Sequence, residues 1–187
     1  MDHSLSKASA GFTMTEMVIT MAIVAILMAI GVPSFKYVTT SNRLSTEVNG
    51  LLGDMQFARS EAIKEGLPVT VCSSASGTQC DGGNNWQSGW IVFLDSINTN
   101  QTVDNGEQVI RVQTAFAPGD TFEPAGPAPF NAITFNREGY GTNTQNATTI
   151  TLQLHDSTAN PAWTRCLAIS PVGMMTTQKA NAAPGCL

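Results

Sequence analysis

The chain has 187 residues, a net charge of −5 and 42% hydrophobic residues. This length suits one long helix and one globular domain, and it is too short for two domains behind such a helix. After Gly66 the chain carries four basic residues against eight acidic ones, which argues against bulk electrostatic binding to nucleic acid.

Residues 11–35 form a nearly uninterrupted apolar segment close to the N-terminus. With its flanking apolar residues, the segment approaches the roughly 20 residues that a helix needs to cross a bilayer. The residues before it are polar and end at a small-residue junction, Gly11-Phe12, whereas an ordinary secretory signal is cut after its apolar segment. Cleavage after Gly11 would remove a short polar leader and keep the apolar helix.

One carboxylate, Glu16, interrupts this apolar segment. An unpaired charge at such a depth costs about 2.5–3.5 kcal/mol even on a lenient insertion scale, so it usually has a partner. A plain membrane anchor leaves Glu16 unexplained. Pro33 lies in the same segment and predicts a kink or a local break in the helix.

These residues resemble the class III signal of type IV pilins and of type II secretion pseudopilins. The resemblance rests on Gly11, Phe12, Thr13, Glu16 and Pro33. It implies that a prepilin peptidase cuts between Gly11 and Phe12 and methylates the new amine, which makes N-methyl-phenylalanine. It also implies an assembly contact in which Glu16 of an incoming subunit pairs with the Phe12 amine of its neighbour and neutralises both charges.

The chain becomes polar after Ser34 but keeps a helical period up to Lys64. Apolar residues recur at spacings of four and three, which places them in one stripe of an amphipathic helix that packs under the globular domain. Gly66 and Pro68 are predicted to end the helix. The stripe consists of Leu44, Val48, Leu51, Met55, Ala58 and Ala62.

The rest of the chain predicts short β-strands separated by turns, which is typical of an antiparallel sheet or sandwich. Residues 117–129 contain several prolines and glycines and are predicted to form a loop. The last two strands should form a hairpin around residues 170–172. The predicted strands are 69–72, 90–94, 108–113, 133–135, 149–154, 165–169 and 173–177.

The four cysteines indicate disulfides. An even number in a chain that crosses the inner membrane is typical of an oxidising periplasm. No C-x-x-C motif occurs and only His155 remains after the leader, so no metal site is expected. Cys72–Cys80 and Cys166–Cys186 are favoured because each pair closes a local loop, and crossed pairing stays open.

The globular half resembles the GspH/FimT family, which contains minor pilins of type IV pili and a minor pseudopilin of type II secretion. With the N-terminal signal, the resemblance covers nearly the whole chain. The matching segments are A-R-S-E-A-I-K at 58–64, P-V-T-V-C at 68–72, Cys80, W-Q-S-G-W-I-V-F-L-D at 86–95 and D-N-G-E-Q-V-I-R at 104–111.

The family resemblance and the pattern imply the same α+β fold. A long N-terminal helix, with a transmembrane half and an amphipathic half, packs on a C-terminal antiparallel β domain of the pilin-like GspH type. The expected segments are a leader at 1–11, a transmembrane and assembly helix at 12–35, an amphipathic helix at 36–65 and a periplasmic β-rich domain at 66–187.

Two other features of the sequence are candidate binding sites. Trp86 and Trp90 could form a recognition surface, but we expect Trp90 to fill the core and Trp86 to pack against the loop closed by the first disulfide. The segment 95–107 is rich in oxygen ligands, yet its spacing does not match the twelve-residue calcium loop. A long hairpin with Asn-Gly turn chemistry is the favoured interpretation.

The C-terminal segment bears on DNA binding. Members of the family that are linked to natural transformation carry a Gly-Arg-x-Arg motif there, and the corresponding residues here are Gly173-Met174-Met175-Thr176. The missing arginines argue against DNA binding. Cys166 in a late strand and Cys186 near the end resemble FimU-type minor pilins, which are thought to join a tip or priming complex.

The sequence predicts a non-enzymatic protein without a cofactor, since no nucleophile–base pair is visible and Ser88 is not in a G-x-S-x-G elbow. Asn146-Ala147-Thr148 matches a glycosylation acceptor, an incidental match on such a short pattern.

The function expected first is that of a minor pilin that primes a type IV pilus at its tip. The chain would be held in the inner membrane by one helix, with its C-terminal domain in the periplasm, and would later lie in the pilus fibre. Expected partners are other minor and major pilins, the prepilin peptidase and the pilus assembly platform. The alternatives are an H-type minor pseudopilin of a type II secretion system and a DNA-binding minor pilin of natural transformation.

Overall fold

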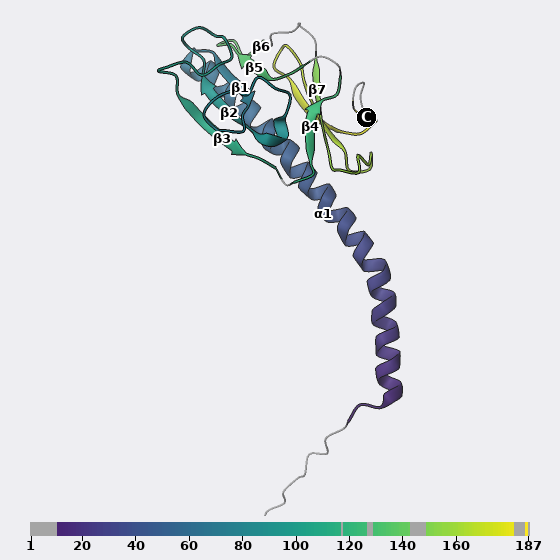
Figure 1. Ribbon diagram of the computed structural model, residues 1–187. Coiled ribbons are helices and arrows are strands. Elements are labelled where there is room, and N and C mark those ends of the chain that lie inside the picture. Colours follow the sequence, from purple (N-terminus) through teal and green to yellow (C-terminus); the bar gives the residue numbers. More distant parts are fainter. Residues whose placement is uncertain (1–10, 117, 127–128, 143–148, 182–185, 187) are drawn as a thin grey trace, which may run out of the picture. The chain divides into compact units, whose positions relative to one another are not determined.

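The computed structural model describes residues 11–116, 118–126, 129–142, 149–181 and 186 (Figure 1). Leader residues 1–10 and the Asn146-Ala147-Thr148 acceptor sequence lie outside this range. The chain divides into two compact units, Met1–Thr39 and Thr40–Leu187.

One helix, α1 (Met14–Glu65), contains both the apolar segment and the amphipathic stripe. It is helical without interruption through Pro33, so a local break is wrong, and the kink that the sequence also allows stays a prediction. Proline removes only the hydrogen bond of its own missing N–H, and the neighbouring turns keep theirs. The helix ends as predicted at Gly66, which has a φ of 67° and donates its N–H to Ala62 O at 3.0 Å.

The first unit exposes all of its described side chains from residue 11 to residue 39. This part of α1 is long and apolar enough to cross a membrane. Such a continuous apolar surface is unfavourable in water, which indicates that lipid or other subunits cover it.

The described strands of the second unit form two antiparallel sheets (Figure 1), which confirms the predicted α+β class. A short 3₁₀ helix, η1 (Trp86–Ser88), precedes β2. The five-stranded sheet, in the order β3-β2-β1-β5-β6, contains β1 (Val69–Ser73), β2 (Gly89–Leu94), β3 (Val109–Thr114), β5 (Ala132–Phe135) and β6 (Gly141–Thr142). The four-stranded sheet, in the order β4-β7-β8-β9, contains β4 (Thr121–Pro124), β7 (Ile150–His155), β8 (Arg165–Ile169) and β9 (Met175–Lys179).

Strand β4 lies inside the segment 117–129, which the sequence predicts to be a loop. Its proline, Pro124, is the last residue of an edge strand, a position that proline tolerates. Strand β9 starts two residues later than predicted, because Gly173 belongs to the preceding turn and donates its N–H to Ser170 O.

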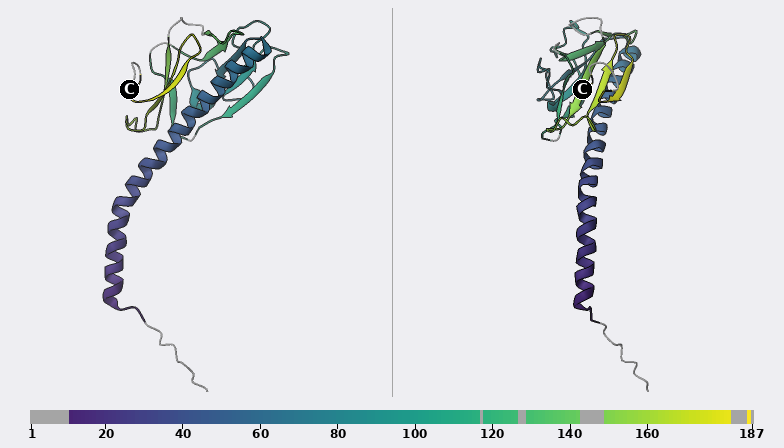
Figure 2. Two further views of the ribbon diagram at one scale, coloured as in Figure 1. Left: turned by 180° about the vertical axis from the view of Figure 1, so that it is seen from behind. Right: turned by 90° about the vertical axis from the view of Figure 1, so that its right-hand side faces the viewer.

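The main core lies between the second half of α1 and both sheets (Figure 2). All six residues of the predicted stripe are buried, which confirms the amphipathic helix. They pack with residues of both sheets such as Trp90, Phe122 and Leu167, and each large apolar side chain contributes roughly 1.5–3 kcal/mol. A second cluster on the other face of the five-stranded sheet contains Cys72, Ile91, Phe93 and Ala132.

Trp86 lies in the main core, whereas Cys72 and Cys80 belong to the second cluster, so the predicted packing of Trp86 against the loop closed by the first disulfide is wrong. Its ring stacks on Phe130, with 5.4 Å between the ring centroids, and its Nε1 donates to Phe130 O at 2.7 Å. Trp90 is buried, as predicted, and its Nε1 donates to Asp54 Oδ2 at 2.8 Å. Both rings have their polar atom satisfied inside the protein, which is how tryptophan is tolerated in a core.

Candidate functional site

The residues predicted to act in processing and assembly lie at the start of α1. Gly11 and Phe12 precede the helix and are exposed. Thr13 is the N-cap of α1, because its Oγ1 accepts a hydrogen bond from Glu16 N at 3.2 Å. Glu16 follows three residues later, at the spacing of a capping box and in the turn where the helix dipole favours a carboxylate. The T-x-x-E pattern at residues 13–16 is the signal by which the sequence could predict this cap.

The Glu16 carboxylate makes no hydrogen bond or ion pair with the described part of the chain. It is exposed and stands among exposed apolar side chains such as Met17 and Ile19. Its predicted partner, the Phe12 amine, belongs to another subunit, so the pairing stays a prediction about the assembly.

The disulfides join Cys72 to Cys80 and Cys166 to Cys186, the local pairs that the sequence favours. The first closes the connection that follows β1, with Cys72 buried in the second cluster. The second ties Cys186 to β8, and the Cys186 carbonyl accepts a hydrogen bond from Asn181 N. The C-terminal end of the chain is thereby attached to the four-stranded sheet.

The oxygen-rich segment 95–107 uses its carboxylates to hold its own backbone. Asp95 is fully buried and accepts hydrogen bonds from Thr70 Oγ1 and from the backbone of Asn100 and Gln101. Glu107 accepts two further backbone N–H bonds in the same loop. The described residues contain no group of three or more His, Cys, Asp or Glu side chains that could hold a metal ion.

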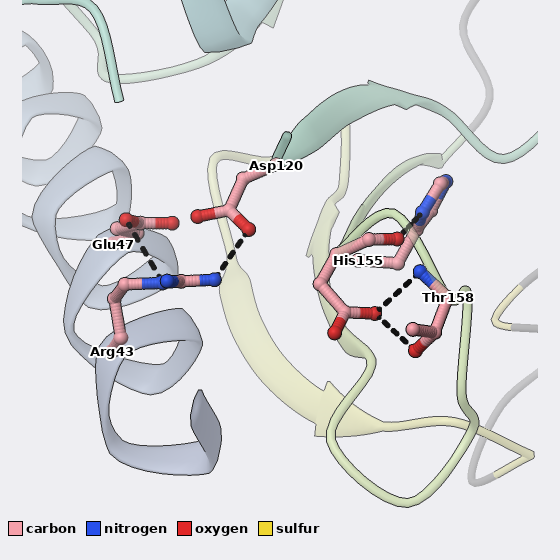
Figure 3. A network of polar contacts seen from close by, with 6 residues as sticks. Arg43, Glu47, Asp120, His155 and Thr158 are labelled. Atoms are coloured by element: carbon pink, nitrogen blue, oxygen red, sulfur yellow. Dashed lines mark hydrogen bonds and ion pairs between the residues drawn. The ribbon is translucent and has the colours of Figure 1, made fainter. Parts of the chain in front are cut away.

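A network of charges joins α1 to the start of β4 (Figure 3). Arg43 lies between two carboxylates, with Nη2 2.6 Å from Asp120 Oδ1 and Nε 4.0 Å from Glu47 Oε1. Only 1% of the Asp120 side chain and 12% of the Glu47 side chain are exposed. The other carboxylate oxygens, Glu47 Oε2 and Asp120 Oδ2, are buried and have no hydrogen-bond partner among the described residues.

Two buried carboxylates thus share one arginine, and this balance shifts their protonation. Burial and, to a smaller extent, the charge of Asp120 raise the pKa of Glu47 to about 7, against the lowering effect of Arg43. Burial also raises the pKa of Asp120, against the lowering effect of Arg43, while the nearby charge of Asp156 adds to the increase. One proton held by this pair would leave one negative charge for one positive charge.

The residues that correspond to the Gly-Arg-x-Arg motif, 173–176, lie in the turn between β8 and β9 and at the start of β9. Gly173 has a φ of 76° here, and a Cβ atom on it would lie 2.3 Å from Gly139 O. The same carbonyl accepts a hydrogen bond from Arg59 Nε at 2.9 Å. The turn is therefore closely packed, and it presents Met174 to solvent where the motif would place arginine.

Each half of the chain matches a known family or motif. A model of the family described as type II transport protein GspH matches residues 47–173. The prokaryotic N-terminal methylation motif matches residues 6–32. No curated protein matches the chain.

Solved structures of pilin-like proteins share this fold. The Pseudomonas aeruginosa type IV minor pilin FimU is 19% identical over 76% of this chain and 93% of that one, with a TM-score of 0.58. The Vibrio cholerae minor pseudopilin EpsH, from the Type 2 Secretion System, is 11% identical over 73% of this chain and 97% of that one, with a TM-score of 0.50. The family model covers more than half of the chain, and the protein belongs to the family described as type II transport protein GspH.

Proposed function

We propose that this chain is a non-enzymatic minor pilin of a type IV pilus. One observation carries the proposal: an exposed apolar helix, capped by Thr13, presents the unpaired Glu16 ahead of a GspH-family domain. The prepilin is cut between Gly11 and Phe12, and the new Phe12 amine is methylated. In the filament, Glu16 of one subunit pairs with the Phe12 amine of the next, so that neither charge stays alone in an apolar bundle.

Before assembly, residues 12–35 hold the chain in the inner membrane, with residues 66–187 in the periplasm. The exposed apolar part of α1 and the disulfides support this location, since disulfides persist in an oxidising compartment. The pilus assembly platform then adds the subunit to other minor and major pilins, and the chain acts in priming, at the tip.

A second candidate is the H-type minor pseudopilin of a type II secretion system. The family description and the fold shared with EpsH favour it. The chemistry of α1 is the same in both roles, and only the filament differs.

DNA binding in natural transformation is not proposed. In the described second unit, Arg111 and Arg137 pair with carboxylates, and Arg165 is buried. The described cations without an acidic partner, Arg59, Arg165 and Lys179, are too few to track a phosphate backbone.

Glu16→Ala tests the assembly role. We expect much less of this variant than of wild type in sheared surface filaments, with normal amounts in the membrane, because the incoming subunit has lost the partner of the Phe12 amine. Immunoblots of both fractions measure this, and tryptophan fluorescence checks that the second unit is folded.

Two further variants make the test specific. Glu16→Gln keeps the shape of the side chain and removes its charge, so it should fail like Glu16→Ala. Glu65→Ala removes a carboxylate from the other end of α1 and should assemble normally. Normal assembly of both Glu16 variants would refute the pairing.

A further inference from the structure

Four of the described basic side chains in the second unit lie close to a carboxylate: Arg43, Lys64, Arg111 and Arg137. Arg59, Arg165 and Lys179 have no acidic partner among the described residues, although the chain carries more acid than base. Arg165 and Lys179 lie directly opposite each other in the ladder between β8 and β9. Two of the three unpaired cations are therefore neighbours.

Arg165 is the unusual member of this pair, because only 9% of it is exposed. A buried charge is normally paired with an opposite charge, since neutral groups replace only part of its hydration. The guanidinium of Arg165 joins β8 to α1 through hydrogen bonds to Ser41 and Ser45, which explains why an arginine occurs at this position. These hydrogen bonds do not compensate its positive charge. All of its hydrogen bonds go to neutral acceptors: Ser41 Oγ, Ser45 Oγ, Ala162 O and Thr164 O.

A cavity of about 210 Å³ opens beside Arg165, between α1 and strands β8 and β9, and we name it the Arg165 pocket. No carboxylate lines it among the described residues. Asn49 and Thr177 offer side-chain donors that make no hydrogen bond within the described part of the chain. The pocket is lined by Ser45, Val48 and Asn49 from the helix and by Arg165, Thr177, Gln178 and Lys179 from the strands.

The size and charge of the Arg165 pocket restrict what it can hold. Small-molecule and cofactor sites usually measure about 300–1,000 Å³, so this pocket suits an anion the size of one side chain. Its two cations and free neutral donors match a carboxylate, which accepts several hydrogen bonds at once. A phosphate backbone would need a longer track of cations than the two found here.

We infer that the Arg165 pocket receives the carboxylate of an Asp or Glu side chain from a neighbouring subunit. Arg165 supplies the buried charge, and exposed Lys179 supplies the second charge at the mouth. This inference rests on the proposed function, because filament assembly brings the second subunit into contact. In the filament, subunits would then touch at two places: through their apolar helices and through their globular units.

Zero-length crosslinking with a carbodiimide tests this contact. The reagent joins an amine to a carboxylate as an amide only where the two already touch. Sheared filaments and membrane vesicles that contain the full chain are treated, digested and analysed by mass spectrometry. We expect Lys179 to be joined to an Asp or Glu of another subunit.

Lys64 is the internal control, because its Nζ lies 3.2 Å from Glu61 Oε2 and 3.0 Å from Glu65 Oε1 in the same chain. If Lys64 is crosslinked but Lys179 is not, in either fraction, the inference is wrong. It is also wrong if Lys179 is joined only to its own chain. The proposed function fails separately, when immunoblots find the chain in membranes but never in filaments.

Lys179→Gln gives a second, functional measurement. We expect roughly threefold to tenfold less of this variant in sheared filaments, as for loss of one charge at an interface rim. Lys64→Gln, another exposed lysine, should match wild type. Equal amounts of the two variants would count against a carboxylate in the Arg165 pocket.

Discussion

Glu47 and Asp120 show how the fold changes the chemistry of individual acidic residues. In the sequence they lie far apart and neither stands out. The fold buries both beside Arg43, and each keeps one carboxylate oxygen without a hydrogen-bond partner among the described residues. The folded chain therefore holds a proton at a pH where the unfolded chain has released it.

Replacing Glu47 with Gln should make the stability of the second unit depend less on pH. Burial raises the pKa of Glu47 from 4.5 to about 7, so the stability from this group is present below about pH 4.5 and is lost as the pH rises through about 7. Across that range we expect the wild-type free energy of unfolding to fall by roughly 1–3 kcal/mol relative to the variant, since one pKa unit corresponds to about 1.4 kcal/mol. Denaturant titrations followed by tryptophan fluorescence at several pH values measure this.

Glu138→Gln is the matched control for that titration. Glu138 is exposed, and a hydrogen bond from Arg137 lowers the pKa of its carboxyl, so any effect on the pH dependence has the opposite sign. If the wild-type free energy of unfolding falls with pH by the same amount relative to Glu47→Gln and to Glu138→Gln, Glu47 is not the cause of the pH dependence.

Gly89 is a second residue whose role depends on its surroundings. It has a φ of 107°, and a Cβ atom there would lie 2.3 Å from Gln113 O. Because the obstacle is backbone, we expect Gly89→Ala to destabilise the second unit by roughly 2–3 kcal/mol in denaturant titrations. Gly53→Ala, in an open position on α1, should instead stabilise by about 0.5–1 kcal/mol. Similar effects of the two changes would contradict this account.

At the scale of elements, α1 is one helix with two kinds of surface. From residue 11 to residue 39 every described side chain is exposed, and from Leu44 onward a single stripe is buried. The periodicity of the sequence predicts both surfaces, because the helix period decides which residues share a face. Short edge strands have too few residues to show a period in the sequence. The sequence therefore does not predict β4 and β6, which are stabilised by pairing with β7 and β5.

The disulfide between Cys166 and Cys186 should stabilise the second unit more than the one between Cys72 and Cys80. The two pairs are separated by 20 and 8 residues, and closing the longer loop restricts the unfolded chain more. We expect Cys166→Ser with Cys186→Ser to lower the free energy of unfolding by about 3 kcal/mol. Denaturant titrations of the two double variants compare the pairs, and a smaller loss for the longer loop would contradict the prediction.

At the scale of the whole molecule, the function proposed here depends on both halves of the chain. A strain without this gene should lose most of its sheared surface pili and regain them on complementation, if the chain primes a type IV pilus. Normal piliation together with lost protein secretion would favour the pseudopilin role instead. Amounts of pilin in sheared fractions and of secreted protein in culture medium decide between these outcomes.

The sequence alone predicted the N-terminal assembly signal, the amphipathic stripe and the α+β class, and it favoured the local disulfide pairs while crossed pairing stayed open. These features are local or periodic, so neighbouring residues carry the information. Only the tertiary structure showed that Glu47, Arg43 and Asp120 meet, that Trp86 enters the core, and that Arg165 and Lys179 line one pocket. Such contacts join residues far apart in the chain, and their burial and charge balance exist only once both sheets have packed on α1.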